Sequence, residues 1–289
     1  MRIVLIGANG QLGSELCVAL KKYDLIALTD KDIDITDIDS VFQICHKHKP
    51  EIIINTAAYV RVDDCEENVD LAFKVNALGA RNVAVAAQQI DAAIVQLSTD
   101  YVFGADKNRT RPYTEFDNPA PISIYGESKL AGEKYVQHLC SKHFIVRTSA
   151  LFGRAGSMGK GGNFVETMIK LAQEKDELRV VNDQVFSPTY AVDLADAIMD
   201  LIDTRFYGVF HITNKGICSW YEFTQEIIKL TGFGTRVTPI STMEYPQKAE
   251  RPRYSVLDNY QLKLLGMRDM RNWKLALKDY MEKRHITEE

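Results

Sequence analysis

The first half of the chain alternates short apolar runs with amphipathic stretches of helical periodicity. The apolar runs are unbroken, a pattern typical of parallel strands that are buried on both faces. We expect strands at residues 2–7, 25–29, 52–56, 93–97 and 144–147, and helices at residues 11–23, 38–48 and 71–89. Helices of this length between strands predict right-handed crossovers, and therefore an α/β fold with a Rossmann-like, doubly wound parallel sheet.

The pattern changes after Phe152. A glycine-rich stretch at residues 154–163 predicts a mobile loop. Helices are expected at residues 164–175, 220–230 and 272–284, and residues 193–202 and 209–212 are expected to return the chain toward the sheet. We predict a dinucleotide-binding domain of residues 1–152 with 178–213, and a smaller, discontinuous substrate-binding lobe of residues 153–177 with 214–289. Trp220 and Trp273 fall in helical patterns of this lobe, and we predict that both belong to its core.

Composition excludes several classes of protein. With 289 residues, a net charge of -4 and 46% hydrophobic residues, the chain is typical of a globular protein and has no basic excess for nucleic acid. No apolar stretch approaches the ~20 residues that span a bilayer. The five cysteines are odd in number and contain no C-x-x-C, which disfavours disulfides and structural zinc and favours the cytoplasm. No histidine–carboxylate grouping has metal-ligand spacing, so we predict no metal.

A glycine motif follows the first strand. Gly7, Gly10 and Gly13 are spaced three residues apart, between an apolar run and a helical pattern. Glycines at such a turn allow a pyrophosphate to approach the backbone and the free amides of a helix N-terminus. Asp30, at the end of the second strand, stands where a carboxylate binds the adenosine ribose. The alternatives, glycines that only terminate a strand and a carboxylate that only caps a turn, stay open.

Tyr125 and Lys129 are four residues apart and follow Thr99 by 26 and 30 residues. On a helix this spacing places the phenol and the ammonium on one face. A phenol titrates near ~10, and a nearby cation favours its ionised form, so the pair suits proton transfer next to a bound dinucleotide. These residues predict a nicotinamide-dependent oxidoreductase.

Further motifs make the chain resemble the dTDP-4-dehydrorhamnose reductase family, within the extended short-chain dehydrogenases. They comprise Asn55-Thr56-Ala57-Ala58-Tyr59, Val62-Asp63-Asp64-Cys65-Glu66, Val75-Asn76-Ala77-Leu78-Gly79, Ser98-Thr99-Asp100-Tyr101-Val102-Phe103, Tyr125-Gly126-Glu127-Ser128-Lys129, Arg147-Thr148-Ser149, Asn182-Asp183-Gln184, Ser187-Pro188-Thr189-Tyr190 and Arg251-Pro252. Together they extend from residue 1 to about residue 258. No single one is specific, whereas the combination is.

The resemblance implies reduction of the 4-keto group of dTDP-4-dehydro-L-rhamnose to dTDP-L-rhamnose, a precursor of surface polysaccharide, with NADPH or NADH. It implies that Thr99, Tyr125 and Lys129 are catalytic. The positions that match dinucleotide contacts are Gly10, Gln11, Leu12, Asp30, Asp34, Ile35, Ala57, Ala58 and Tyr59, beside Gly7, Gly13, Tyr125 and Lys129. Thr99 and Asp100 are expected near the sugar. Arg251 suits a pyrophosphate because a guanidinium offers paired donors, although a solvated loop arginine is the alternative.

One position departs from the family pattern. Ala150 stands after Arg147-Thr148-Ser149, where relatives usually have a tryptophan that contacts the nucleotide sugar. Either the pocket is larger, or another residue fills the space. Some relatives dimerise through a metal held by glutamates. Glu15 is available here, but no convincing set of further ligands accompanies it. We therefore expect a homodimer and predict no metal in it.

Two alternative functions are left open. The first is a nucleotide-sugar epimerase or dehydratase. A dehydratase usually has an acidic pair after the threonine, whereas here Asp100 is followed by Tyr101. The second is a binding protein like the regulatory β subunit of methionine adenosyltransferase. That role tolerates an intact Tyr125–Lys129 pair, but the short termini show no partner-binding extension.

Overall fold

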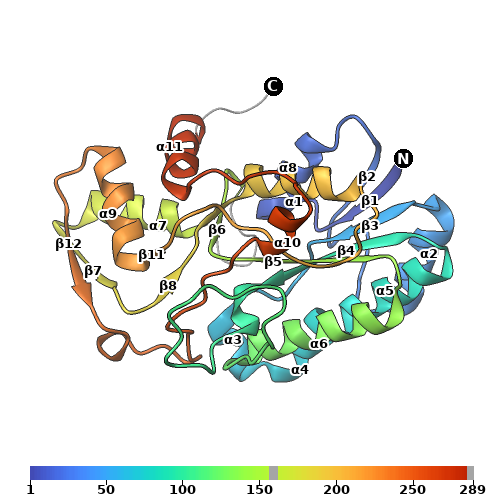
Figure 1. Ribbon diagram of the computed structural model, residues 1–289, viewed down its shortest axis with the longest axis horizontal. Coiled ribbons are helices and arrows are strands. Elements are labelled where there is room, and N and C mark those ends of the chain that lie inside the picture. The colour runs from blue at the N-terminus through green and yellow to red at the C-terminus, as the bar shows by residue number, and fades with distance from the viewer. Residues whose placement is uncertain (156–161, 285–289) are drawn as a thin grey trace.

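A six-stranded sheet forms the centre of the larger part of the molecule (Figure 1). The computed structural model describes residues 1–155 and 162–284. The strands are β1 (Arg2–Ile6), β2 (Asp24–Leu28), β3 (Ile52–Asn55), β4 (Ala93–Thr99), β5 (His143–Thr148) and β10 (Gly208–His211). They lie in the order β10–β5–β4–β3–β1–β2, and all neighbours are parallel. The predicted doubly wound parallel sheet is confirmed.

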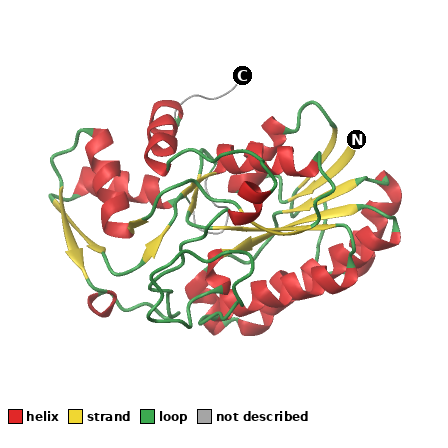
Figure 2. Ribbon diagram, in the orientation of Figure 1, coloured by secondary structure: helices red, strands yellow, loops and turns green. Residues whose placement is uncertain are grey.

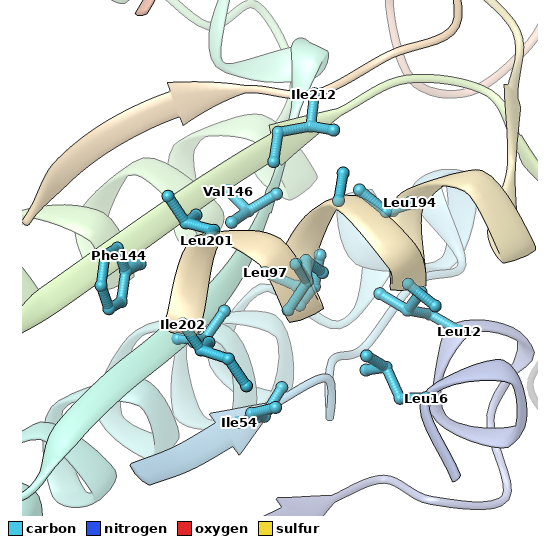
Figure 3. Close-up of a cluster of buried hydrophobic side chains, with 14 of the residues drawn as sticks. Leu12, Leu16, Ile54, Leu97, Phe144, Val146, Leu194, Leu201, Ile202 and Ile212 are labelled. Atoms are coloured by element: carbon cyan, nitrogen blue, oxygen red, sulfur yellow. The ribbon is translucent and has the colours of Figure 1, made fainter. Parts of the chain in front are cut away.

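Helices cover both faces of this sheet. α1 (Gln11–Ala19) and α8 (Ala191–Ile202) pack on one face, and α2 (Ile38–His48), α5 (Ala80–Gln89) and α6 (Ile124–Leu139) pack on the other. Successive strand residues point to opposite faces, so Ile53 joins the core under α2 and α5 while Ile54 joins the core under α1 and α8. Figure 3 shows Ile54 and Leu97 of the sheet beside Leu12 of α1 and Leu194 of α8. Burial on both faces explains the unbroken apolar runs.

The strand order places a binding crevice at the centre of the sheet. From β1 the chain passes to β2 on one side, and it then returns to β3 on the other side of β1. The loops that leave β1 and β3 therefore diverge at the carboxyl ends of these strands. A reversal of this kind is where doubly wound sheets bind ligands.

The helix expected at residues 71–89 is present and ends at Gln89, but it contains a π-helical segment that the sequence pattern did not predict. After α3 (Val62–Glu67) come α4 (Val69–Phe73), a π-helical segment (Lys74–Gly79) and then α5. In the π-helical segment the buried Asn76 side chain accepts from the Tyr59 backbone N–H at 2.8 Å and donates to the Tyr59 carbonyl at 3.1 Å. It also donates to the Ser128 hydroxyl of α6 at 3.0 Å. The wider turn thus lets one side chain join the loop after β3 to α6.

The smaller lobe has two short strand pairs and three main helices (Figure 2). β7 (Glu177–Val181) pairs in parallel with β12 (Arg236–Ile240), and β8 (Val185–Phe186) pairs with β11 (Cys218–Ser219). α7 (Phe164–Glu174), α9 (Trp220–Thr231) and α11 (Trp273–Lys283) enclose an aromatic core. Because β7 pairs with β12 and β8 pairs with β11, we now propose that residues 178–186 belong to this lobe and not to the dinucleotide-binding domain. The division into two units stays a proposal.

The remaining elements are short. They are β6 (Leu151–Phe152), which pairs with β9 (Thr189–Tyr190), α10 (Tyr260–Leu264) and two 3₁₀ turns, Asp100–Val102 and Thr242–Glu244. Residues 156–161 of the loop expected at 154–163 lie outside the described residues. Within the described ranges, no helix is both long and apolar enough to cross a membrane.

Candidate active site

Two cavities lie at the carboxyl ends of the parallel strands. The larger, of ≈ 630 Å³, is bounded by the turn from β1 to α1, the end of β2, the loop after β3 and the start of α6. The smaller, of ≈ 180 Å³, lies between the ends of β4 and β5 and the smaller lobe. Val60 and Tyr125 line both cavities. Ligands held in the two cavities would therefore meet at Tyr125.

Most residues expected to contact a dinucleotide line the larger cavity. They are Gly7, Gly10, Gln11, Leu12, Asp30, Asp34, Ile35, Ala57, Ala58, Tyr125 and Lys129. Gly13 and Tyr59 do not line this cavity. Sequence reasoning missed others, among them Asn9, Thr29, Thr56, Leu97 and Thr148. The signal that could have found them is position, because residues at the carboxyl ends of central parallel strands face the ligand crevice.

The glycine turn is shaped by close backbone approaches. Gly7 has φ +84°, and a Cβ there would lie 2.6 Å from the Thr56 hydroxyl oxygen. A Cβ on Gly13 would lie 2.0 Å from the Gly7 carbonyl oxygen, so only glycine lets α1 pack this closely on the turn. Gly10 is the N-cap of α1 and cannot cap with a side chain, so the first amides of the helix are available to a phosphate.

Two polar atoms on the wall of the larger cavity have no hydrogen-bond partner among the described residues. They are the amide nitrogen of Gln11 and the hydroxyl of Thr148, and both are buried. A buried polar group without a partner costs about 1–3 kcal/mol, so these atoms suit a ligand that pairs with them. Together with the glycine turn and the helix N-terminus, they fit a nicotinamide dinucleotide.

The end of the cavity at β2 carries two carboxylates. Asp30 lies on the wall, and its Oδ1 accepts from the Asn9 amide at 3.2 Å. Asp34 accepts from the backbone N–H and the hydroxyl of Thr36, both at 2.8 Å, and the backbone bond is the main reason that its pKa is lowered. Asp30 is therefore the better candidate for an adenosine ribose, since the accepting oxygen of Asp34 already serves the local turn.

Tyr125 and Lys129 share a face of α6, as the spacing predicts. Ser123 caps this helix by accepting from the Gly126 backbone N–H at 3.2 Å. A Cβ on Gly126 would lie 2.2 Å from the Tyr101 carbonyl oxygen, so the first turn packs directly on the segment that follows Thr99. Lys129 is buried, and its ammonium donates to the Leu97 carbonyl oxygen at 2.6 Å. The end of β4 thus holds Lys129 at the cavity wall.

Burial shifts both titrating groups toward their neutral forms. Desolvation raises the pKa of Tyr125 above its usual value, against the hydrogen bond with Thr99. Desolvation also lowers the pKa of Lys129 to about 8, against the charge of Glu133. We expected Lys129 to lower the pKa of Tyr125, and that prediction was wrong for this structure because desolvation dominates. The phenol is therefore protonated at neutral pH, the form that a proton donor requires.

Asp100 is buried at the centre of three hydroxyl groups. It accepts from Ser149 at 2.8 Å, from Ser255 at 2.5 Å and from Thr99 at 3.1 Å. Burial raises the pKa of Asp100 to about 6, although these hydrogen bonds oppose the shift. Asp100 therefore orients the Thr99 hydroxyl beside Tyr125 and ties Ser255, from the late loop, to the ends of β4 and β5.

The structure separates the four residues expected near the substrate. Thr99, Asp100 and Ala150 line the smaller cavity, but Arg251 lies outside its wall. The Arg251 guanidinium, 9% exposed, forms a 2.8 Å ion pair with Asp63 of α3. This pair fastens the late loop to α3, a position that does not support the expected pyrophosphate contact.

The two tryptophans differ in their surroundings. Trp273 belongs to the core of the smaller lobe, as expected. Trp220 is partly buried: it packs against this core, as expected, and it also lines the smaller cavity, which was not predicted. The sequence pattern could not reveal the position at the cavity. Helical periodicity does not distinguish a first residue that faces only the core from one that also faces an adjoining cavity.

Glu15 forms an ion pair with Arg154. Its buried carboxylate accepts two hydrogen bonds from Arg154, at 2.7 and 3.1 Å. The described residues contain no cluster of three or more histidine, cysteine, aspartate or glutamate side chains placed to hold a metal ion.

Comparison with known proteins decides the family. The protein-family model described as RmlD substrate binding domain matches residues 1–286 of this chain. A dTDP-4-dehydrorhamnose reductase structure from Clostridium acetobutylicum is 48% identical, with a TM-score of 0.94 over 99% of this chain and 100% of that one. The chain belongs to this reductase family.

Two further relatives of the family extend the comparison. A Bacillus anthracis dTDP-4-dehydrorhamnose reductase, solved in complex with NADP, is 46% identical, with a TM-score of 0.92 over 98% of this chain and 99% of that one. A spore coat polysaccharide biosynthesis protein, SpsK, from Bacillus subtilis is 43% identical over 98% of both chains. The predicted class, an NAD(P)H-dependent oxidoreductase of nucleotide-sugar biosynthesis, is confirmed, and it displaces the epimerase and binding-protein alternatives.

Proposed function

We propose that this protein reduces the 4-keto group of dTDP-4-dehydro-L-rhamnose to give dTDP-L-rhamnose. The observation that supports this most directly is the position of Tyr125, which lines both the dinucleotide cavity and the smaller cavity. A reductase needs such an arrangement, because its proton donor must reach the carbonyl oxygen at the place where the cofactor and the substrate meet. The names of the relatives point to the rhamnose nucleotide and to polysaccharide synthesis.

The residues of the site have separate tasks in this proposal. The bound dinucleotide, NADPH or NADH, supplies the reducing equivalent, and the glycine turn with Gln11 and Asp30 holds it. Tyr125, protonated at neutral pH, donates a proton to the oxygen at C4 as negative charge develops there. The Thr99 hydroxyl, which donates to Asp100 at 3.1 Å in this structure, would turn to donate its hydrogen bond to the same oxygen when the substrate is bound. Lys129 carries its charge below a pH of about 8 and stabilises the phenolate that remains.

The decisive experiment supplies enzymatically generated dTDP-4-dehydro-L-rhamnose with NADPH or NADH to the purified protein. We expect oxidation of the cofactor and formation of dTDP-L-rhamnose, identified by NMR. Tyr125→Phe serves as the inactive variant, and Tyr135→Phe, an exposed tyrosine on the same helix, serves as the matched control. Failure with this sugar alongside turnover of another 4-keto nucleotide sugar would reject the substrate. Tight dinucleotide binding without any turnover would reject the reductase.

We also propose a cytoplasmic location and a homodimer. All five cysteines, each within the described residues, are thiols, which suits a reducing compartment. The dimer follows from the resemblance alone. Light scattering during size-exclusion chromatography tests it, and a monomeric mass at micromolar concentration would reject it.

A further inference from the structure

Trp220 is an aromatic side chain at the wall of the smaller cavity. It is the first residue of α9, and it lines the same 180 Å³ space as Thr99 and Tyr125, the candidate reaction centre. Its ring is partly exposed, unlike that of Trp273, which is 3% exposed. An aromatic ring that is open on one side at a polar reaction centre offers a flat, apolar surface to a ligand.

The Trp220 ring is held in a defined orientation. Phe186 of β8 and Phe164 of α7 lie against it, with ring centroids at 4.0 and 4.4 Å. The backbone is fixed as well, because Ser219 and Glu222 form a reciprocal capping box at the start of α9. The Ser219 hydroxyl also donates to Asn182, just after β7, at 2.7 Å. A ring supported in this way loses little freedom when a ligand packs on it.

Ala150 leaves space on the same cavity wall. Its backbone has φ +41°, in the left-handed region that few residues other than glycine adopt. Its methyl group packs against the same aromatic cluster as Trp220, and both residues line the cavity. Because these two side chains adjoin one space, a large side chain at position 150 would compete with the indole of Trp220.

The size of the cavity indicates which part of the substrate it takes. At ≈ 180 Å³ it is smaller than the ~300–1,000 Å³ pockets that enclose whole drug-sized ligands. It therefore accommodates one ring of a nucleotide sugar. The ring that must reach Tyr125 and Thr99 is the hexose, whose carbonyl is reduced. A 6-deoxyhexose has an apolar C–H face and a methyl group that can pack on an indole.

We propose that Trp220 is the substrate-contacting aromatic residue of this protein and packs against the apolar face of the hexose. This inference rests on the proposed function for the identity of the sugar. Trp220→Ala is expected to raise the Michaelis constant for the sugar nucleotide about 10- to 100-fold, the range associated with losing an apolar contact in a pocket. The affinity of this variant for NADPH should equal that of the unchanged protein, because Trp220 does not line the dinucleotide cavity.

A direct test observes the indole itself. The chain has two tryptophans, so protein labelled with 5-fluorotryptophan gives two ¹⁹F resonances, and Trp220→Phe assigns them. Adding dTDP-L-rhamnose should move the Trp220 signal and leave the buried Trp273 signal in place. Adding dTDP alone should leave both unchanged. A shift of the Trp220 signal with dTDP alone would assign the ring to the nucleotide, and no shift with either ligand would also overturn the proposal.

Exchanging the side chains at positions 150 and 220 tests whether the two positions share one space. Ala150→Trp alone should weaken sugar binding, because Trp220 already occupies the space, whereas the double variant Ala150→Trp/Trp220→Ala should recover most of the loss. Phe233→Ala, at an exposed aromatic after α9, is the matched control and should have no effect. If Ala150→Trp alone strengthened binding, the proposal would be wrong. The ¹⁹F measurement needs no turnover, so it judges the contact even if the proposed reaction fails.

Discussion

Glu133 and Arg147 form an ion pair in the interior, next to Lys129. Glu133 lies one turn after Lys129 on α6, and Arg147 lies on β5. The guanidinium donates to the two carboxylate oxygens at 2.9 and 2.6 Å, and the Ser98 hydroxyl also donates to Glu133. Both side chains are at most 4% exposed. Glu133→Gln would keep the shape of the side chain and leave the Arg147 charge buried without its counter-charge.

The expected loss is large because the remaining charge has no access to water. Removing one partner of a buried ion pair typically destabilises a protein by about 3–5 kcal/mol. The total stability of a domain is about 5–15 kcal/mol, so the variant should lose a substantial fraction of its free energy of unfolding. A second effect reaches the active site. The charge of Glu133 raises the pKa of Lys129 against burial, so its removal should move that pKa below about 8.

Urea denaturation followed by circular dichroism measures the first effect. The matched control is Asp91→Asn, which breaks the exposed Lys142–Asp91 pair and should cost at most about 1 kcal/mol. The double variant Glu133→Leu/Arg147→Met should recover much of the loss, because apolar replacements remove the unpaired charge. A loss below about 1 kcal/mol for Glu133→Gln would refute the reasoning, since Arg147 would then have found water or another partner.

Four further predictions concern the site. Tyr125→Phe should lower kcat by about 100- to 10,000-fold while dinucleotide affinity, measured by fluorescence titration, stays nearly unchanged; a smaller loss would reject Tyr125 as the proton donor. The dissociation constant of NADPH should rise as the pH increases through about 8, because Lys129 loses its positive charge there, and Lys129→Met should bind weakly at every pH. Asp30→Ala should weaken NADH more than NADPH, because a carboxylate accepts from a ribose hydroxyl but repels a 2′-phosphate; equal losses would make Asp30 a structural cap. Gly13→Ala should abolish dinucleotide binding, because the new Cβ would lie 2.0 Å from the Gly7 carbonyl oxygen, and near-normal affinity would contradict this packing.

The sequence by itself determined the features that depend on near neighbours. The unbroken apolar runs predicted strands buried on both faces, and burial on both faces is what the central strands show. The spacing of Gly7, Gly10 and Gly13 identified the turn before α1. A separation of four residues was enough to place Tyr125 and Lys129 on one face of α6. These features follow from the period of a helix or strand and from steric limits on the backbone, so they can be predicted from local sequence.

Tertiary structure alone decided which distant residues meet. Arg251 pairs with Asp63 and lies outside the wall of the smaller cavity, although 188 positions separate the two residues. β7 pairs with β12, which lies more than 50 positions later in the chain, and the start of α9 brings Trp220 to the cavity that Ala150 also lines. No periodic pattern encodes such contacts, because they depend on how separate elements pack.

The electrostatics of the site was also decided by the tertiary structure. Sequence reasoning expected the Lys129 cation to lower the pKa of Tyr125, but burial raises it. Desolvation depends on every element that excludes water from a group, whereas a motif gives only the charges that stand near that group in the chain. The chemistry of this protein was therefore predictable from its residue types, and its titration behaviour was set by the packing around them.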